Sequence, residues 1–313
     1  MKNDNGRRNI IYTSNILDRL YNLKTHNIIH LDNGYSYAGT EAVVDGVPFM
    51  VGLCTHNYQY HILTPNEIIL MEILLSWDAL TNENEQEYTY ISFKDIDWMR
   101  NRQKRNKSYV QSNHALYLAT VKSLEKIYLI YGNEDNLVNG QGLSDSPLMN
   151  IEYLYEQNEI VGLKYNFGDL GIALKELKQM VSLDMNIFRY SSTEFMKYQI
   201  LRYMVISIYM NRTKKYEFSR TNKSILKAIT APGATADYYD YIIDKKYLYK
   251  YLERYHSRLN EVMESLKQTR FIRDYSITYD RSKRSLLTSY GRVLVMTNVS
   301  KKKRTYSASL SKE

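Results

Sequence analysis

"LTPNEIILMEILLSW", residues 63–77, has both the start signals and the apolar spacing of a helix that packs against a core. Thr64 can cap such a helix, Pro65 suits its first turn, and Glu67 lies where a capping box needs an acid. The apolar residues recur at steps of three and four, which gathers them on one helix face. We therefore predict a core-facing helix that begins directly after Thr64.

A second stretch, SSTEFMKYQILRYMVISIYM (191–210), repeats this plan. Ser191 or Ser192 can serve as its cap, and Glu194 occupies the position that matches Glu67 of the first stretch. Its apolar residues follow the same three- and four-residue steps. We therefore predict two copies of one structural unit.

Each of these helices precedes a polar stretch, a short strand and a small helix. The strand and the small helix lie within YTYISFKDIDWM (88–99) in the first copy and within KYEFSRTNKSIL (215–226) in the second. Equal spacing would be a coincidence in unrelated segments, so it supports the duplication. The distance from capping acid to strand is 24 residues in both copies: Glu67 to Ile91, and Glu194 to Phe218.

Each copy continues with a longer helix and then with a hairpin. The longer helix ends in VKSLEKIYLIYG (121–132) in the first copy and in MESLKQTRFIRDY (263–275) in the second. The apolar period then changes to two around a polar turn, which is typical of a hairpin, in 149–167 and again in 272–298. Helix, short strand, helix, longer helix and hairpin is the order of a winged helix. We therefore predict an α+β fold with two tandem winged-helix domains.

The remaining segments lie before, between and after the two copies. The N-terminal part has a helix from Ser14 and a hairpin in AVVDGVPF (42–49), where Asp45-Gly46 is a strong two-residue turn signal. GDLGIALKELKQMVSLD (168–184) has the pattern of a linker helix. The predicted segments are an N-terminal helix and hairpin extension (1–62), winged-helix domain 1 (63–167), a linker helix (168–189), winged-helix domain 2 (190–299) and a basic disordered tail (300–313).

Composition restricts the class of partner. The chain has 313 residues and a net charge of +8, which favours a polyanion such as nucleic acid. The start of the chain lacks the apolar core of a signal peptide, and the longest apolar runs, at 68–75 and 203–210, are too short to span a membrane. A single cysteine, Cys54, excludes an internal disulfide and a cysteine-based zinc cage. We expect a cytoplasmic protein without a membrane partner.

A basic run precedes the longer helix of the first copy, in MRNRQKRNKSYVQSNHALYLATVKSL (99–124). Loop cations suit phosphate contacts, which position a protein on a duplex, whereas the start of a recognition helix reaches base edges. A basic surface loop without a partner is the alternative. The predicted phosphate contacts are Arg100, Arg102, Lys104, Arg105 and Lys107. The outward face of the helix has Ser108, Gln111, Ala115 and Lys122. Of these, Ser108 and Gln111 can reach base edges.

The longer helix of the second copy has a buried stripe and a charged face. The stripe is Leu248, Leu252, Tyr255, Leu259, Val262 and Leu266. The opposite face has Lys246, Lys250, Arg254, Ser257 and Arg258, followed by Glu261 and Glu264. Positive charge near the helix start opposes the helix dipole, at a cost of up to about 1 kcal/mol, which favours an anionic partner. The predicted wing tip adds Arg281, Lys283 and Arg284.

The sequence offers little for catalysis. His56 and His61 are five residues apart, which on a strand places them on opposite faces, so we expect no metal site there. A Gly-rich phosphate loop is absent from the sequence, which argues against ATP-driven unwinding. The sequence also lacks the His-hydrophobe-His motif of rolling-circle nucleases. We therefore expect neither catalytic residues nor a cofactor.

The tandem order, the capped "TPNE" and "SSTE" helix starts and the long third helix before a hairpin resemble the iteron-binding plasmid replication initiators. The resemblance covers roughly residues 63–298. It implies a protein that binds repeated origin sequences, acts on adjacent A·T-rich DNA and recruits host replication proteins. In that family, dimers often repress the initiator's own gene, so a homodimer is implied as well.

The primary hypothesis is therefore a non-catalytic, sequence-specific binder of double-stranded DNA that acts in the initiation of plasmid or phage replication. A transcriptional or partition regulator could use the same scaffold. A rolling-circle nicking protein with a tyrosine nucleophile is a second alternative, and a protein scaffold that contacts no DNA is a third. Gene neighbourhood would identify the regulator, and a covalent tyrosine–DNA adduct would identify the nicking protein. Binding that does not respond to salt would identify the protein scaffold.

Overall fold

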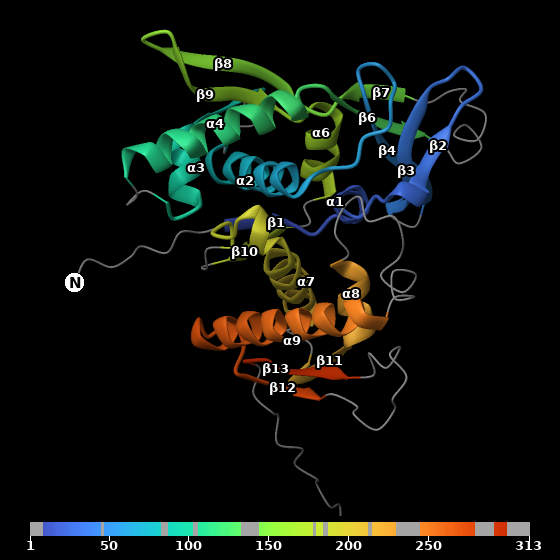
Figure 1. Cartoon of the computed structure of the whole chain (residues 1–313), viewed down its shortest axis with the longest axis vertical. Coiled ribbons are helices and arrows are strands. Elements are labelled where there is room, and N and C mark those ends of the chain that lie inside the picture. The colour runs from blue at the N-terminus through green and yellow to red at the C-terminus, as the bar shows by residue number, and fades with distance from the viewer. Residues whose placement is uncertain are drawn as a thin grey trace, which may run out of the picture.

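The chain folds into a mixed α/β structure in which two similar units lie one above the other (Figure 1). The first unit, around residues 65–166, fills the upper part of the view with the N-terminal segment, and the second unit, residues 195–296, fills the lower part. The computed structural model describes residues 9–44, 47–82, 87–102, 106–132, 144–177, 180–183, 187–211, 215–229, 245–278 and 291–298.

The two units share the order helix, strand, helix, helix and hairpin and the same order of strands in the three-stranded sheet; in the first unit, residues 127–147 between the longer helix and the hairpin add two strands to a separate sheet. In each unit the last strand lies in the middle of a three-stranded sheet, between the first strand and its hairpin partner. The first unit comprises α2 (Pro65–Thr81), β5 (Thr89–Ser92), α3 (Phe93–Met99), α4 (Lys107–Leu124), β8 (Asn150–Glu156) and β9 (Glu159–Asn166). The second comprises α7 (Phe195–Asn211), β11 (Glu217–Thr221), α8 (Asn222–Ala228), α9 (Lys245–Gln268), β12 (Asp274–Thr278) and β13 (Arg292–Met296).

The equal spacing in the sequence corresponds to equivalent places in the two units. Ile91 lies in β5 and pairs with Leu163 of the middle strand, while Phe218 lies in β11 and pairs with Val295 of the other middle strand. Both side chains are buried. The predicted repetition of helix, strand, helix, helix and hairpin is thus confirmed.

The helix caps agree with the sequence in one copy and differ in the other. Thr64 accepts a hydrogen bond from the backbone N of Glu67, and the Glu67 carboxylate accepts one from the backbone N of Thr64 at 2.6 Å, which is the predicted capping box. In the second copy Ser192–Glu194 forms a short 3-10 turn, and α7 begins only at Phe195. The cap there, Ser191, makes no side-chain capping bond, so that part of the prediction is wrong.

The N-terminal segment is completed by strands from the first unit. It contributes α1 (Asn15–Tyr21), β2 (Ile28–His30), β3 (Ser36–Val44) and β4 (Val47–Thr55), and Ser14 caps α1 as predicted. The predicted hairpin also forms, since Val44 pairs with Val47; its turn residues, Asp45 and Gly46, lie outside the described residues. The segment is continuous with the first unit, because β6 (Ile127–Gly132) and β7 (Ser144–Pro147) extend the sheet in the order β2-β3-β4-β6-β7.

Strand β6 corrects the predicted end of the longer helix. The sequence pattern predicts that VKSLEKIYLIYG (121–132) ends that helix, but α4 stops at Leu124. Residues Ile127–Gly132 are extended because they pair along the whole of their length with β4. A pairing partner more than seventy positions earlier in the chain thus decides the local structure.

The linker is also only partly helical. Helix α6 (Gly168–Leu177) is followed by β10 (Met180–Leu183), which pairs with β1 (Asn9–Tyr12) in an antiparallel two-stranded sheet. Strand β1 also contacts α2, since the backbone N of Ile10 donates to Ser76 Oγ at 2.8 Å. The beginning of the described chain is therefore held against both the linker and the first unit.

Helix α2 is surrounded by other elements rather than packed on one face. Every residue from Glu67 to Ser76 is buried. Ser123 of α4 donates to the Glu67 carboxylate at 2.6 Å, and Tyr165 of β9 donates to the carbonyl of Leu74 at 2.7 Å. Because α2 also contacts α7 through an ion pair at Glu72, the two units share one continuous core. Across the described ranges, no helix is both long and apolar enough to cross a membrane.

Candidate nucleic-acid interface

The outward face of α4 is the one that the sequence predicts. Asn106 caps the helix by accepting a hydrogen bond from the backbone N of Tyr109 at 2.9 Å. On the inner side Tyr117, Val121 and Leu124 are buried. Ser108, Gln111, Ala115 and Lys122 are all exposed; Ser112, Leu116 and Ala119, which the sequence analysis did not name, are exposed beside them. Their helical spacing was the signal that could have identified them.

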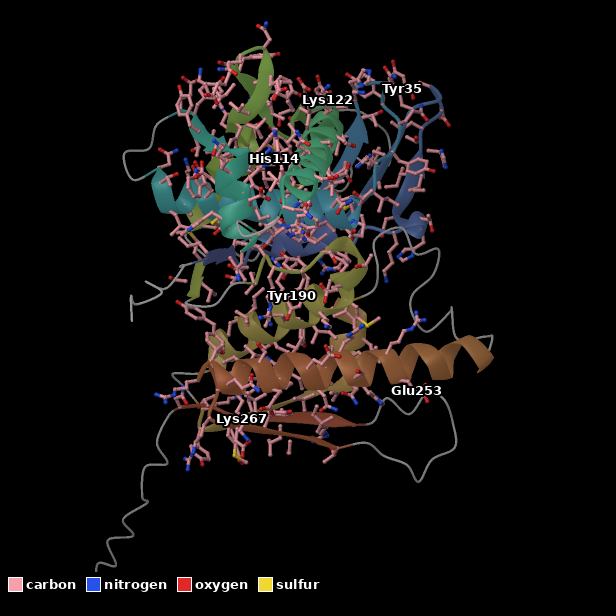
Figure 2. All side chains as sticks on the ribbon, turned by 60° about the vertical axis from the view of Figure 1, so that its left-hand side comes forward. Tyr35, His114, Lys122, Tyr190, Glu253 and Lys267 are labelled. Atoms are coloured by element: carbon pink, nitrogen blue, oxygen red, sulfur yellow. The ribbon has the colours of Figure 1, made fainter. Side chains whose placement is uncertain are left out.

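A buried carboxylate fixes α4 on α3. Asp97 of α3 accepts a hydrogen bond from Tyr117 at 2.8 Å and contacts Nε2 of His114 at 3.0 Å, and both partners belong to α4. Burial raises the pKa of Tyr117 to about 12. His114 and Lys122 are labelled on the same helix in Figure 2. The orientation of the exposed face thus depends on contacts on the opposite side of α4.

Two arginines of the predicted phosphate-binding loop are buried. Arg100 donates from Nη2 to the carbonyl of Tyr190 at 2.8 Å, and its guanidinium lies 5.7 Å from the centre of the Tyr117 ring. Burial lowers the pKa of Arg100. Arg102 donates from Nη1 to Oδ1 of Asn113 at 3.3 Å. The predicted phosphate contacts would need both side chains on the surface, whereas the structure buries them, because both pack the loop against the protein.

The other members of that loop are differently placed. Lys107 is exposed at the first position of α4, where it lies beside the outward face. Lys104 and Arg105 lie outside the described residues. Among the predicted phosphate contacts that the structure describes, Lys107 is the one whose side chain is exposed.

We expect Arg100→Ala to lower the free energy of unfolding by about 1–3 kcal/mol, because the buried carbonyl of Tyr190 loses its donor. Urea denaturation would measure the loss. Lys107→Ala is the matched control: its side chain is exposed, so a change within about 0.5 kcal/mol is expected. A stable Arg100→Ala protein would contradict the internal role of this arginine.

Helix α9 has the predicted inner stripe. Tyr255, Leu259, Val262 and Leu266 are fully buried, and Tyr255 donates to Oδ1 of Asn222 on α8 at 3.1 Å. Leu248 and Leu252 belong to α9, but their side chains lie outside the described set. The second unit therefore presents its long helix much as the first unit presents α4.

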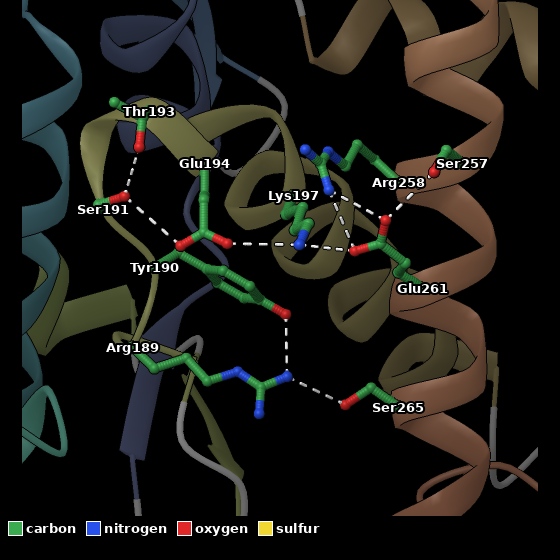
Figure 3. A network of polar contacts seen from close by, with 10 residues as sticks. All are labelled: Arg189, Tyr190, Ser191, Thr193, Glu194, Lys197, Ser257, Arg258, Glu261 and Ser265. Carbon is green, nitrogen blue, oxygen red and sulfur yellow. Dashed lines mark hydrogen bonds and ion pairs between the residues drawn. The ribbon is translucent and has the colours of Figure 1, made fainter.

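The outward face of α9 has one arginine in an internal network and one outside it. Arg258 bonds to Glu261 at 3.0 Å, Ser257 donates to the same carboxylate at 3.2 Å, and Lys197 of α7 reaches it at 2.6 Å (Figure 3). The contact with Lys197 holds the pKa of Glu261 below its ordinary value despite some burial. Arg254, one turn earlier, is exposed and makes no hydrogen bond or ion pair with any residue that the structure describes.

The remaining predicted contacts lie outside the side chains that the structure describes. Lys246 and Lys250 lie on the first two turns of α9, and their side chains are outside the described set. Arg281, Lys283 and Arg284, the predicted wing tip, lie between the described ends of β12 and β13. His61, for which no metal site is expected, contacts the Glu67 carboxylate of the capping box at 3.2 Å.

The fold thus defines a two-unit protein in which each unit exposes one long helix. No protein-family model matches the chain, and no curated protein matches its sequence. A crystal structure of RctB domains 2-3 is similar to it with a TM-score of 0.50 and 8% sequence identity, over 91% of this chain and 97% of that one. A structure of selenomethionine derivatives of RctB domains 2 and 3 has a TM-score of 0.49 and 8% identity, over 84% and 91%. At this identity the similarity concerns the fold alone.

Proposed function

We propose that this protein is a non-catalytic replication initiator that binds specific sequences in double-stranded DNA through two winged helices. The observation that carries the proposal is the repeated unit: the same element and strand order occurs twice, and each copy exposes one face of its longer helix. In winged and helix-turn-helix modules, that helix enters the major groove. RctB, whose domains 2-3 have a similar fold, is a replication initiator.

The charge distribution supports DNA as the partner. The net charge of +8 favours a polyanion. Lys107 and Lys122 lie at the two ends of the exposed face of α4, and Arg254 lies on α9. Cations placed along helices that also offer neutral polar groups can combine phosphate contacts with base contacts. Host replication proteins and a second copy of the chain, as the family resemblance implies, are part of the same proposal, as is a cytoplasmic location.

DNase footprinting on the DNA that flanks the gene tests this proposal. Two modules in successive major grooves would protect roughly 20 bp. We expect protection over direct repeats beside an A·T-rich tract. The affinity should fall as the salt concentration rises: for each phosphate contact, the logarithm of the binding constant should drop by about 0.9 for every tenfold increase in salt. Equal affinity for a shuffled duplex, or affinity that ignores salt, would contradict the proposal.

Two further outcomes of the same study would change the assignment. A footprint at a promoter without repeats would favour a transcriptional or partition regulator. Incubation with supercoiled origin DNA and Mg²⁺ or Mn²⁺ tests for catalysis, because a covalent 5′-phosphotyrosine adduct would show a nicking enzyme.

A further inference from the structure

The two exposed helix faces have different chemistry. Between Lys107 and Lys122 the outward face of α4 carries no formal charge: it consists of Ser108, Gln111, Ser112, Ala115, Leu116 and Ala119. The outward face of α9 is charged along its described length, with Arg254 and Arg258 followed by Glu261 and Glu264. Two units with the same strand order therefore present two different surfaces.

The groups on α4 match adenine and thymine. A glutamine such as Gln111 can bond in a bidentate manner to N6 and N7 of adenine, and aliphatic side chains contact the C5-methyl group of thymine. Leu116 has 39% of its surface exposed, so it offers an apolar contact on a helix face that is otherwise small or polar. The cations that read O6 and N7 of guanine are missing from this face between its two terminal lysines.

The groups on α9 match guanine instead. Arginine is the usual side chain for bidentate recognition of guanine in the major groove. Arg258 is already bound to Glu261, whereas Arg254 has no such partner among the described residues. Arg254 is therefore the arginine of this face whose guanidinium is available for a base.

We propose that α4 reads A·T pairs through Gln111 and Leu116 while α9 reads guanine through Arg254, so that the target is a bipartite sequence. This inference rests on the proposed DNA-binding function. The order of the two halves is fixed, because the shared core around α2 holds the two units together.

Base analogues in the footprinted duplex test the two halves separately. Deoxyuridine in place of thymidine removes only the C5-methyl group, and 7-deazaguanine removes only the N7 acceptor. Each methyl group in contact with Leu116 should contribute about fourfold in affinity, by analogy with burial of one CH₂. We expect deoxyuridine to weaken binding in one half of the site and 7-deazaguanine to weaken it in the other.

Protein variants then assign each half to a helix. Leu116→Ala should remove the response to deoxyuridine and keep the response to 7-deazaguanine, and Arg254→Ala should do the reverse. Ile172→Ala is the matched control, because Ile172 is an exposed aliphatic side chain on α6 that should leave both responses intact. Gln111→Ala should lower discrimination for adenine in the same half that Leu116→Ala affects.

The outcomes separate the two levels of the proposal. If Leu116→Ala leaves the deoxyuridine response unchanged, or if Gln111→Ala alters the response at guanines, the base assignment is overturned although DNA binding stands. If the unsubstituted protein shows no preference for any duplex, the proposed function itself has failed.

Discussion

Replacing Arg202 with methionine should lower the free energy of unfolding by about 3–5 kcal/mol, because the substitution leaves a buried carboxylate without its cation. Arg202 of α7 donates from Nε to Glu72 of α2 at 3.0 Å and from Nη2 to the carbonyl of Tyr12 in β1 at 3.0 Å. It also pairs with Asp18 of α1 at 2.5 Å. One side chain thus joins the second unit, the first unit and the N-terminal segment, and Glu72 is only 2% exposed.

Urea denaturation followed by circular dichroism would measure this loss. The double variant Arg202→Met/Glu72→Leu should recover much of the stability, since removing both charges removes the cost of burying one of them alone. Arg189→Met is the control, because Arg189 is exposed and its bond to Ser265 at 3.3 Å lies at the surface. A loss below about 1 kcal/mol for Arg202→Met would show that the junction does not depend on this arginine.

Replacing Arg254 with alanine should weaken binding to the specific duplex by about 1–3 kcal/mol and relax preference at the bases it contacts. Arg258→Ala, one turn along the same helix, should have a smaller effect, because the guanidinium of Arg258 is already bound to Glu261. The two variants remove the same group from the same helix, so they differ chiefly in whether the arginine is free to contact DNA.

Fluorescence anisotropy with the footprinted duplex and a shuffled duplex, both at one salt concentration, would compare the two variants. Arg254→Ala should reduce the ratio of the two affinities, whereas Arg258→Ala should leave that ratio near its original value. Equal losses of specificity in the two variants would mean that the Glu261 network does not decide which arginine contacts the bases.

Local patterns predicted the elements that depend on near neighbours in the chain. The capping box at Thr64, the buried stripe of α9 and the outward face of α4 all follow from spacings of three or four residues. The hairpin between β8 and β9 was likewise predicted from its alternating residues around a polar turn. Gln157 and Asn158 in this turn adopt the positive φ angles of a tight two-residue turn.

Features that depend on distant partners were not predictable from those patterns. Arg100 resembles any loop cation in the sequence, yet its partner Tyr190 is 90 residues away. Strand β6, IYLIYG, has the β-branched and aromatic residues of a strand, but the prediction joined it to the preceding helix, and its pairing with β4 could not be read from these residues. The ion pair between Arg258 and Glu261 has the local i,i+3 spacing of one helix, whereas the contact of Glu261 with Lys197 of α7 depends on how two distant helices pack.

The pairing of β1 with β10 has a consequence for how the chain is made. During synthesis β1 leaves the ribosome well before β10, so its backbone groups have no strand to bond until the linker emerges. The rest of the first unit can fold in that interval, but β1 can pair with β10 only after residues 180–183 have been synthesised. The pairing of β1 is therefore a late step in the folding of the first unit, and it can be completed before the second unit, residues 195–296, has left the ribosome.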